Sequence, residues 1–276
     1  MTINCKGNLI DLTTPKVMGI LNLTPDSFFD GGRYNAMENA LEQTEKMLQD
    51  GATFIDVGAY SSRPDAKDVS ETLELQRLIP VVEQLMTHFP KIILSIDTFR
   101  AKVAAAALDA GAALINDISA GQLDDNMLPT VADYQVPYIA MHMRGTPQTM
   151  KTLTHYNALT KEVVIYFSEV LQKAQALSIK DVILDPGFGF AKTREQNFEL
   201  LAQLHRLSAL ERPILAGISR KSMIYKTLDT SPASALNGTT ALHMRCLAQG
   251  AKILRVHDVK EAMECVKLHT EEENYL

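Results

Sequence analysis

The sequence lacks the features that mark several classes of protein. Its three cysteines, Cys5, Cys246 and Cys265, form no CxxC pair and no Cys/His ligand pattern. This spacing indicates reduced thiols rather than disulfides or a zinc site. No stretch approaches the roughly 18 apolar residues of a membrane span. Residues 1–9 hold no apolar run of the kind found in signal peptides. We therefore expect a cytoplasmic protein that does not associate with a membrane.

Motifs for nucleotide binding and nucleophilic catalysis are also missing. The chain has no GxGxxG or GxxxxGK[ST] turn, no HxH or HExxH spacing and no GxSxG element. Its formal net charge of −6 argues against a general nucleic-acid-binding protein. With 276 residues, 46% hydrophobic and 22% charged, the composition is that of a globular protein. That length suits one (β/α)8 barrel, which typically takes about 250 residues.

Short apolar runs alternate with helix-period segments along the chain. The runs are apolar on both faces, as expected for strands of a covered parallel sheet. They predict eight strands, at residues 17–21, 53–57, 92–96, 113–116, 137–141, 182–184, 214–216 and 252–255. Between them, residues 70–88 carry apolar side chains on one helical stripe. Thr193 with Gln196, and Asp258 with Glu261, resemble capping boxes at helix starts.

A weak internal repeat supports this alternation. Three segments read GATFIDV, GAALIND and GAKILRV, and each begins with a glycine placed where a helix should stop: Gly51, Gly111 and Gly250. The fifth residue after each glycine is polar and ends an apolar strand: Asp56, Asn116 and Arg255. Eight such βα units favour a closed (β/α)8 TIM barrel, an α/β fold in one domain over residues 1–276, rather than a doubly wound sheet.

Polar residues follow nearly every predicted strand, at the end where barrel enzymes place their active sites. The long irregular segments 24–35, 58–69 and 142–154 follow strand ends too. Any single polar residue there is as readily explained as a turn or a helix cap. Amides, carboxylates and cations at almost every exit instead indicate a pocket for a hydrogen-bonding heteroaromatic ring and an anion. The exit residues with such chemistry are Asn22, Asp56, Asp97, Asn116, Asp185, Lys221, Arg255 and His257.

The chemistry of these residues suggests which part of such a pocket binds the ring and which part binds the anion. The carboxylates and amide of Asp97, Asn116 and Asp185 suit a ring that presents adjacent N–H and NH2 groups. Arg255 and His257 form a cationic mouth suited to phosphate. Lys221 is either a donor to the ring or a solvated helix start, and its position alone favours neither. Phe188 and Phe190 either form the wall against a flat ring or belong to the core, and Asn22 offers an oxygen to Mg²⁺.

Eight motifs run in order over nearly the whole chain. They are VMGILNLTPDSFFDGG from Val17, IDVGAYSSRP from Ile55, SIDT around Asp97, IND around Asn116, MHMRGTPQTM from Met141, LDPGFGFAK from Leu184, GISRKSMI from Gly217 and RVHDVKE from Arg255. Together they resemble the motifs of dihydropteroate synthases. The resemblance implies condensation of 7,8-dihydropterin-6-ylmethyl diphosphate with p-aminobenzoate, giving 7,8-dihydropteroate and diphosphate. It also implies a Mg²⁺ cofactor, a homodimer and competition by sulfonamides.

The resemblance assigns roles by matching position. The pterin ring would be held by Asp97, Asn116, Met141, Asp185 and Lys221. The diphosphate would be bound by Asn22, Arg255 and His257, with Asn22 also a metal ligand. The p-aminobenzoate site and its loops would be shaped by Asp30, Ser62, Arg63, Pro64, Phe190, Lys221 and Ser222. The expected catalytic residues are Asp97, Lys221, Arg255 and His257.

The chain departs from the family pattern in its second motif. Many members read GGESTRP where this chain has GAYSSRP, so that Tyr60 replaces a glutamate. The SxG that often precedes the last helix is Asn237–Gly238 here. Alternative hypotheses are a corrinoid-dependent pterin methyltransferase domain, a non-catalytic pterin-binding barrel and a sugar-phosphate barrel enzyme. A methyltransferase domain has no need of the SRK and RVHD segments, and a non-catalytic barrel predicts their loss. A sugar-phosphate barrel enzyme requires a lysine or glutamate within a strand.

Overall fold

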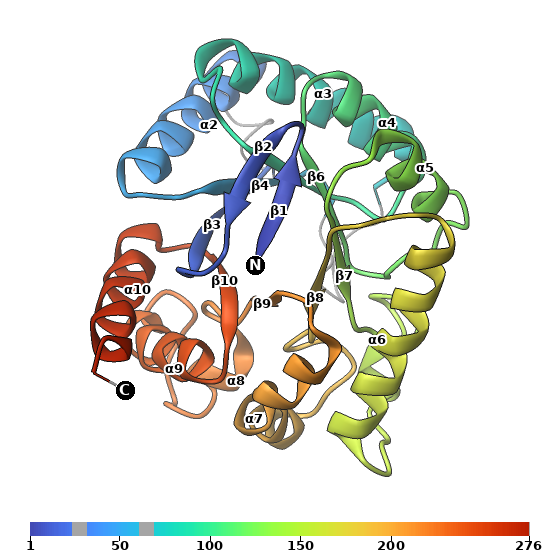
Figure 1. Ribbon diagram of the computed structural model, residues 1–276. Helices are drawn as coiled ribbons and strands as arrows, with labels where there is room; N and C mark the ends of the chain where they lie inside the picture. Colours follow the sequence, from blue (N-terminus) through green and yellow to red (C-terminus); the bar gives the residue numbers. More distant parts are fainter. Residues whose placement is uncertain (24–31, 61–68, 276) are drawn as a thin grey trace.

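Eight parallel strands close into a barrel in the computed structural model, which describes residues 1–23, 32–60 and 69–275. The barrel order begins with β10 beside β3, and Leu254 pairs with Val17 where the barrel closes. Figure 1 shows the helices arranged around this sheet. The strands are β3 (Lys16–Asn22), β4 (Phe54–Gly58), β5 (Leu94–Asp97), β6 (Leu114–Asp117), β7 (Tyr138–Met141), β8 (Val182–Asp185), β9 (Ile214–Ala216) and β10 (Ala251–Val256).

The predicted (β/α)8 barrel and all eight predicted strands are confirmed, with ends that shift by at most two residues. The helices that cover the barrel are α2 (Gly32–Gln49), α3 (Glu71–His88), α4 (Ala101–Asp109), α5 (Met127–Tyr134), α6 (Leu159–Ala176), α7 (Arg194–Ala202), α8 (Ser222–Tyr225), α9 (Leu236–Ala248) and α10 (Val259–Glu273). Two 3-10 helices, η1 (Met150–Thr152) and η2 (Leu204–Leu210), complete the described helices. No helix in this described part is long and apolar enough to cross a membrane.

Local sequence signals account for many of the helix boundaries. Thr193 and Gln196 form the predicted capping box, in which each side chain binds the backbone of the other residue. The three repeat glycines adopt positive φ between a helix and the next strand, at +103° for Gly51, +116° for Gly111 and +92° for Gly250. The capping box predicted for Asp258 is wrong. Asp258 does precede α10, but its side chain makes no cap hydrogen bond because its carboxylate binds a side chain elsewhere.

An N-terminal hairpin, which the sequence did not predict, closes one end of the barrel. Strands β1 (Thr2–Cys5) and β2 (Asn8–Asp11) lie across the barrel end in Figure 1. Their turn has positive φ at Lys6 (50°) and Gly7 (88°), which matches the twist of a tight hairpin. Its buried residues Ile3 and Cys5 join a cluster with side chains from the first half of the barrel strands. The hairpin therefore covers the amino ends of the strands and leaves the carboxyl ends for the site.

Candidate active site

The polar residues of the three repeat units meet inside the barrel. Arg255 donates from Nε to Oδ2 of Asp56 over 2.6 Å, and Asn116 donates from Nδ2 to the same oxygen over 3.0 Å. The second arm of Arg255 donates from an Nη atom to Oδ2 of Asp97 over 2.7 Å. One guanidinium thus joins two carboxylates at the carboxyl ends of β4 and β5.

Barrel geometry explains why these three repeat positions converge. Counted from β3, strands β4, β6 and β10 are the second, fourth and eighth of the barrel. In a (β/α)8 barrel, alternate strands send side chains into the same layer of the interior. Asp56, Asn116 and Arg255 each stand five residues after the glycine of their unit, so a shared place in the repeat becomes a shared layer.

Burial and charge set the protonation of this cluster. The side chain of Asp56 is fully buried, whereas those of Asp97 and Arg255 keep 19% of their exposure. Burial opposes the charge of Arg255, yet the carboxylates of Asp56 and Asp97 raise its pKa above the usual value. Burial also raises the pKa of Asp97 to about 7, and the charge of Arg255 opposes that shift. Arg255 is therefore a permanent cation, and its charge favours the ionised form of the Asp97 carboxylate that it contacts.

A second cluster gathers at the ends of β8 and β9. Asp185 is buried, and its Oδ1 accepts a hydrogen bond from the backbone N–H of Gly187 over 2.8 Å. Lys221 donates from Nζ to the backbone oxygen of Phe188, and the same ammonium lies 4.9 Å from the ring centroid of Phe190. A Cβ added at Gly217 would stand 3.6 Å from Oδ2 of Asp185 and 3.9 Å from Nζ of Lys221. The carboxylate and the ammonium therefore face the same glycine.

These contacts bear on the two interpretations of Lys221. The residue does stand at the start of α8, as a solvated helix start would. Its ammonium, however, turns toward the loop after β8 and the pocket wall. Burial lowers the pKa of Lys221 to about 8, and the charge of Asp185 opposes that shift. Lys221 is thus a donor held inside the site beside the Asp185 carboxylate.

Apolar side chains line the space next to these groups. Met141, at the end of β7, is 3% exposed and belongs to a cluster with Met143 and Ala191. Phe190 is partly buried against that cluster, whereas Phe188 is fully buried in the main core. Of the two phenylalanines, Phe190 is therefore the candidate wall for a flat ring, and Phe188 contributes its backbone oxygen.

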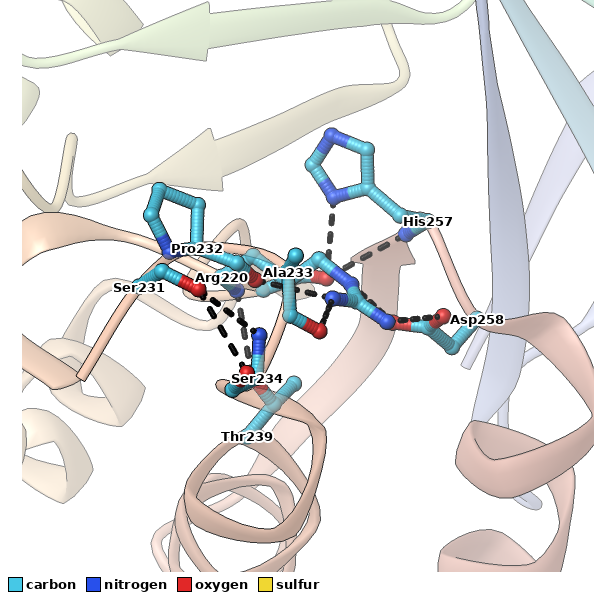
Figure 2. Close-up of polar contacts among 9 residues, drawn as sticks. Arg220, Ser231, Pro232, Ala233, Ser234, Thr239, His257 and Asp258 are labelled. Atoms are coloured by element: carbon cyan, nitrogen blue, oxygen red, sulfur yellow. Dashed lines mark hydrogen bonds and ion pairs between the residues drawn. The ribbon is translucent and has the colours of Figure 1, made fainter. Parts of the chain in front are cut away.

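The segment after β9 and the end of β10 form the mouth of the site. Figure 2 shows Arg220 pointing at Asp258, with bonds of 2.7 Å from Nε and 2.8 Å from an Nη atom to the two carboxylate oxygens. Arg220 also donates to the backbone oxygens of Pro232 and Ala233. This explains the missing helix cap, because the carboxylate of Asp258 orders the Ser-Arg-Lys segment instead.

His257 lies beside that segment and is only partly covered. Its Nδ1 is 3.0 Å from Oγ of Ser219, and its backbone N–H donates to the same oxygen over 3.2 Å. Desolvation and the adjacent charge of Arg255 lower the pKa of His257 below its usual value. The imidazole of the free protein is therefore neutral at pH 7, so the predicted cationic mouth carries its positive charge on Arg255.

The remaining predicted residues divide into three groups. Asn22 ends β3 with an exposed side chain, on the strand next to β10. Ser222 begins α8 directly after Lys221. The predicted residues Asp30, Ser62, Arg63 and Pro64 lie outside the described residues.

The side chains available near Asn22 bear on how the site could bind a metal ion. Within residues 1–23, 32–60 and 69–275, no group of three or more His, Cys, Asp or Glu side chains could hold a metal ion. Mg²⁺ commonly keeps several waters and takes one or two protein oxygens together with the phosphates of a substrate. A single exposed amide oxygen at the barrel mouth fits that mode of binding and does not fit a resident, protein-enclosed ion.

Two residues that are central in the structure have no role predicted from the sequence. The sequence marks Asp56 only as a strand end and a repeat position, whereas in the structure it is the buried partner of Arg255. Lys192 lies within the matched LDPGFGFAK motif, yet nothing in the sequence distinguishes a buried lysine from an exposed one. The repeat was the available signal for Asp56, because it aligned that residue with Asn116 and Arg255.

Comparison with known proteins gives a consistent result. Residues 18–257 match the family model described as pterin binding enzyme. The chain is 47% identical over 255 residues to a dihydropteroate synthase of Synechocystis, covering 91% of this chain and 88% of that protein.

Solved structures agree with this match. A Yersinia pestis dihydropteroate synthase in a sulfonamide drug complex is 41% identical, with a TM-score of 0.93 and complete coverage of both chains. A Xanthomonas albilineans dihydropteroate synthase with 4-aminobenzoic acid is 37% identical, with a TM-score of 0.91, and the match covers 99% of this chain and 98% of that one.

Proposed function

The chain belongs to the dihydropteroate synthase family of pterin-binding enzymes, and we propose how its residues divide the work of that reaction. It is a transferase of folate biosynthesis that joins a pterin diphosphate to p-aminobenzoate. The observation that carries the proposed site is the meeting of Asp97, Asn116, Asp185, Lys221 and Arg255 at the carboxyl end of one barrel.

We assign the pterin ring to the interior of this pocket. Asp185 and Asn116 are buried, so their polar atoms gain most from a partner that arrives with matching donors and acceptors. The carboxylate of Asp185 accepts from the N–H and NH2 edge of the ring, and the ammonium of Lys221 donates to ring acceptors beside it. Met141 packs against the ring face from the end of β7.

We assign the diphosphate to the mouth. Arg255 supplies a permanent positive charge, His257 supplies a neutral imidazole that can donate a hydrogen bond, and Asn22 supplies an amide oxygen for Mg²⁺. When bound there, Mg²⁺ neutralises charge on the diphosphate and so makes it a better leaving group. Loss of diphosphate leaves a carbocation conjugated with the pterin, and Asp97 stabilises that positive charge electrostatically.

We assign the aromatic amine to the side of the pocket formed by Phe190, Lys221 and Ser222. The nitrogen of p-aminobenzoate then attacks the pterin methylene carbon and loses a proton. This sequence of steps uses no protein nucleophile. The same side of the pocket would admit sulfonamides, and the sulfonamide complex of the Yersinia pestis relative supports that proposal.

The reaction can be tested directly. Purified protein supplied with the pterin diphosphate, Mg²⁺ and p-aminobenzoate should release diphosphate and form 7,8-dihydropteroate. Asp185→Asn should lower kcat/KM by about a hundredfold or more, the usual effect of removing one charge-stabilising group. The matched control is Asp181→Asn, which changes a carboxylate just before β8, where it accepts from the backbone N–H of Asn4. A folded wild-type protein without turnover would overturn the assignment.

We further propose that the enzyme works as a homodimer in the cytoplasm. Leu268 on α10 is 65% exposed, so this outer helix offers an apolar side chain to a second copy of the chain. The three cysteines are free and buried, as suits a reducing compartment. Light scattering should give twice the chain mass, and Leu268→Glu should reduce it to that of one chain. A wild-type mass equal to that of one chain would contradict the dimer.

A further inference from the structure

A buried lysine lies beneath the loop that follows β8. Lys192 is only 8% exposed, and its Nζ is 2.9 Å from Nδ1 of His142, 3.0 Å from the oxygen of Gly187 and 3.1 Å from the oxygen of Phe190. A charged ammonium has three N–H donors and no acceptor. The site offers an acceptor for each donor. Burial lowers the pKa of Lys192 to about 7, the charge of Asp185 opposes that shift, and the three acceptors favour the protonated form.

The imidazole that faces Lys192 is held in the neutral form. Burial and the charges of Lys192 and Arg144 lower the pKa of His142 well below its ordinary value. Its ring packs edge-on against Tyr166, with the centroids 4.8 Å apart. A neutral ring can present a lone pair on Nδ1, which is the acceptor that the lysine needs. His142 therefore connects the end of β7 to the loop through Lys192.

The loop held in this way carries several contacts of the proposed site. The N–H of Gly187 binds Asp185, and the backbone oxygen of Phe188 accepts from Lys221. The ring of Phe190 lies against the Lys221 ammonium. Movement of the loop would shift all of these groups together, because they all lie between Gly187 and Phe190.

The loop has one backbone hydrogen bond of its own, from the N–H of Phe190 to the oxygen of Gly187 over 3.1 Å, and two glycines with positive φ. Gly187 has φ +68° and Gly189 has φ +83°, conformations that glycine can leave easily because it lacks a Cβ. The loop also passes very close to β7, since a Cβ at Gly187 would stand 2.1 Å from the oxygen of His142. The side chain of Asn197 accepts from the N–H of Gly189 over 2.7 Å, but Gly187 and Phe190 receive their side-chain donor from Lys192.

We propose that Lys192 is a positioning residue that fixes the Gly187–Phe190 loop and thereby holds Phe190 and the Lys221 acceptor in place for the aromatic amine. This inference rests on the proposed assignment of that loop to the substrate pocket. Lys192 also holds a loop that contacts Asp185. Burial raises the pKa of Asp185, and the charge of Lys221 and the N–H of Gly187 in this loop oppose that shift.

The test replaces Lys192 by methionine, which keeps the length of the side chain and removes its three donors. We expect KM for p-aminobenzoate to rise at least about tenfold with a smaller change in kcat, because a displacement of about 1 Å can cost up to a hundredfold. Val170→Ala is the matched control for lost stability, since Val170 is buried on α6 but belongs to the main core. That control should keep KM. A folded Lys192→Met enzyme with wild-type KM would overturn the proposal.

A second pair of variants decides the question if Lys192→Met does not fold. His142→Leu removes the acceptor, whereas His142→Asn places an amide oxygen near the position of Nδ1. The proposal requires His142→Leu to raise KM for p-aminobenzoate and His142→Asn to restore it toward the wild-type value. Equal KM values for the two variants would contradict it. If Lys192 only stabilised the core, the two variants would change the melting temperature but would not differ from each other in KM.

Hydrogen exchange separates this inference from the proposed function. The backbone amides of residues 187–191 should exchange faster in Lys192→Met, or in His142→Leu, than in Val170→Ala. This measurement needs no substrate, so it applies even if wild-type protein shows no turnover. Unchanged exchange in that segment overturns the positioning role. Faster exchange together with no wild-type turnover would support the role of Lys192 in fixing the loop and would contradict the proposed function instead.

Discussion

Replacing either partner of the Arg255–Asp56 pair should destabilise the protein, but by different amounts. Arg255→Met leaves the fully buried carboxylate of Asp56 without its cation, and only the amide of Asn116 still donates to it. Removing one partner of a buried ion pair costs about 3–5 kcal/mol. After Asp56→Asn, Arg255 still contacts Asp97, and both of these side chains keep 19% of their exposure to solvent. Its cost should be nearer the 1.5–3 kcal/mol of about one charged hydrogen bond.

These energies correspond to measurable shifts in thermal denaturation. For a chain of this size each kcal/mol changes Tm by about 2–4 °C, so Arg255→Met should lower Tm by on the order of 10 °C. Asp56→Asn should lower it by about half as much on the same scale. The double variant should cost less than the sum of the two, by about 1–3 kcal/mol, because the buried charge and its cation are removed together.

The order of the two single variants is the critical result. If Asp56→Asn destabilised the protein as much as Arg255→Met, the buried carboxylate could not depend on this guanidinium as its main compensation. If the double variant cost the full sum, the two side chains would not be coupled, despite the 2.6 Å between Nε and Oδ2. Either outcome would refute the charge network on which the diphosphate assignment depends.

Three further perturbations follow from other parts of the structure. Tyr60→Phe should raise KM for p-aminobenzoate modestly, because it removes the 3.3 Å hydrogen bond from Gln148 at the start of the second loop; steady-state kinetics with Gln148→Ala should give the same increase. Burial lowers the pKa of His243 from 6.5 to about 4, so the unfolded chain binds more protons between these values and the free energy of unfolding falls as pH drops through that window. Urea titrations should show a loss of roughly 3 kcal/mol from His243, and His243→Gln should remove that dependence. Ile3→Asp should lower Tm by unseating the hairpin while both KM values stay unchanged, since Ile3 is buried at the opposite end of the barrel.

The barrel and the ends of its strands could be predicted because the signals are local. Each strand is a short apolar run, and the residue at its carboxyl end is polar because it leads into the loop that follows. Strand exits and motifs together therefore indicate Asp97, Asn116, Asp185 and Arg255 as candidate site residues from the sequence. The hairpin of residues 2–11 was missed because its strands are short and its Lys-Gly turn is not one of the usual turn dipeptides.

Pairings across the barrel could not be predicted, because they depend on closure of the sheet. Asp56 and Arg255 stand 199 residues apart in sequence, and the repeat hinted only that they occupy equivalent positions. The direction of a long side chain is similarly beyond sequence. Lys221 begins a helix and still turns inward, and Asp258 begins a helix and binds Arg220 rather than the helix backbone.

Charge balance within the site leads to the last prediction, which concerns Mg²⁺. The guanidinium of Arg255 already contacts Asp56 and Asp97, and the charge of Lys221 lies beside Asp185. His257 is neutral at pH 7 because its pKa is lowered. These described residues therefore leave little uncompensated positive charge for a diphosphate, which itself carries several negative charges.

A divalent cation that arrives with the substrate would supply the missing charge, and Asn22 at the end of β3 would give it one protein oxygen. Chelation by EDTA should therefore abolish diphosphate release, and added Mg²⁺ should restore it. Calorimetry should show that inorganic diphosphate binds at least about tenfold more weakly without Mg²⁺, a difference of about 1.4 kcal/mol. Asn22→Ala should weaken the Mg²⁺-dependent part of this binding and leave the metal-free part unchanged. Equal affinity with and without Mg²⁺ would show that Arg255 retains enough charge for the diphosphate despite its two carboxylate partners.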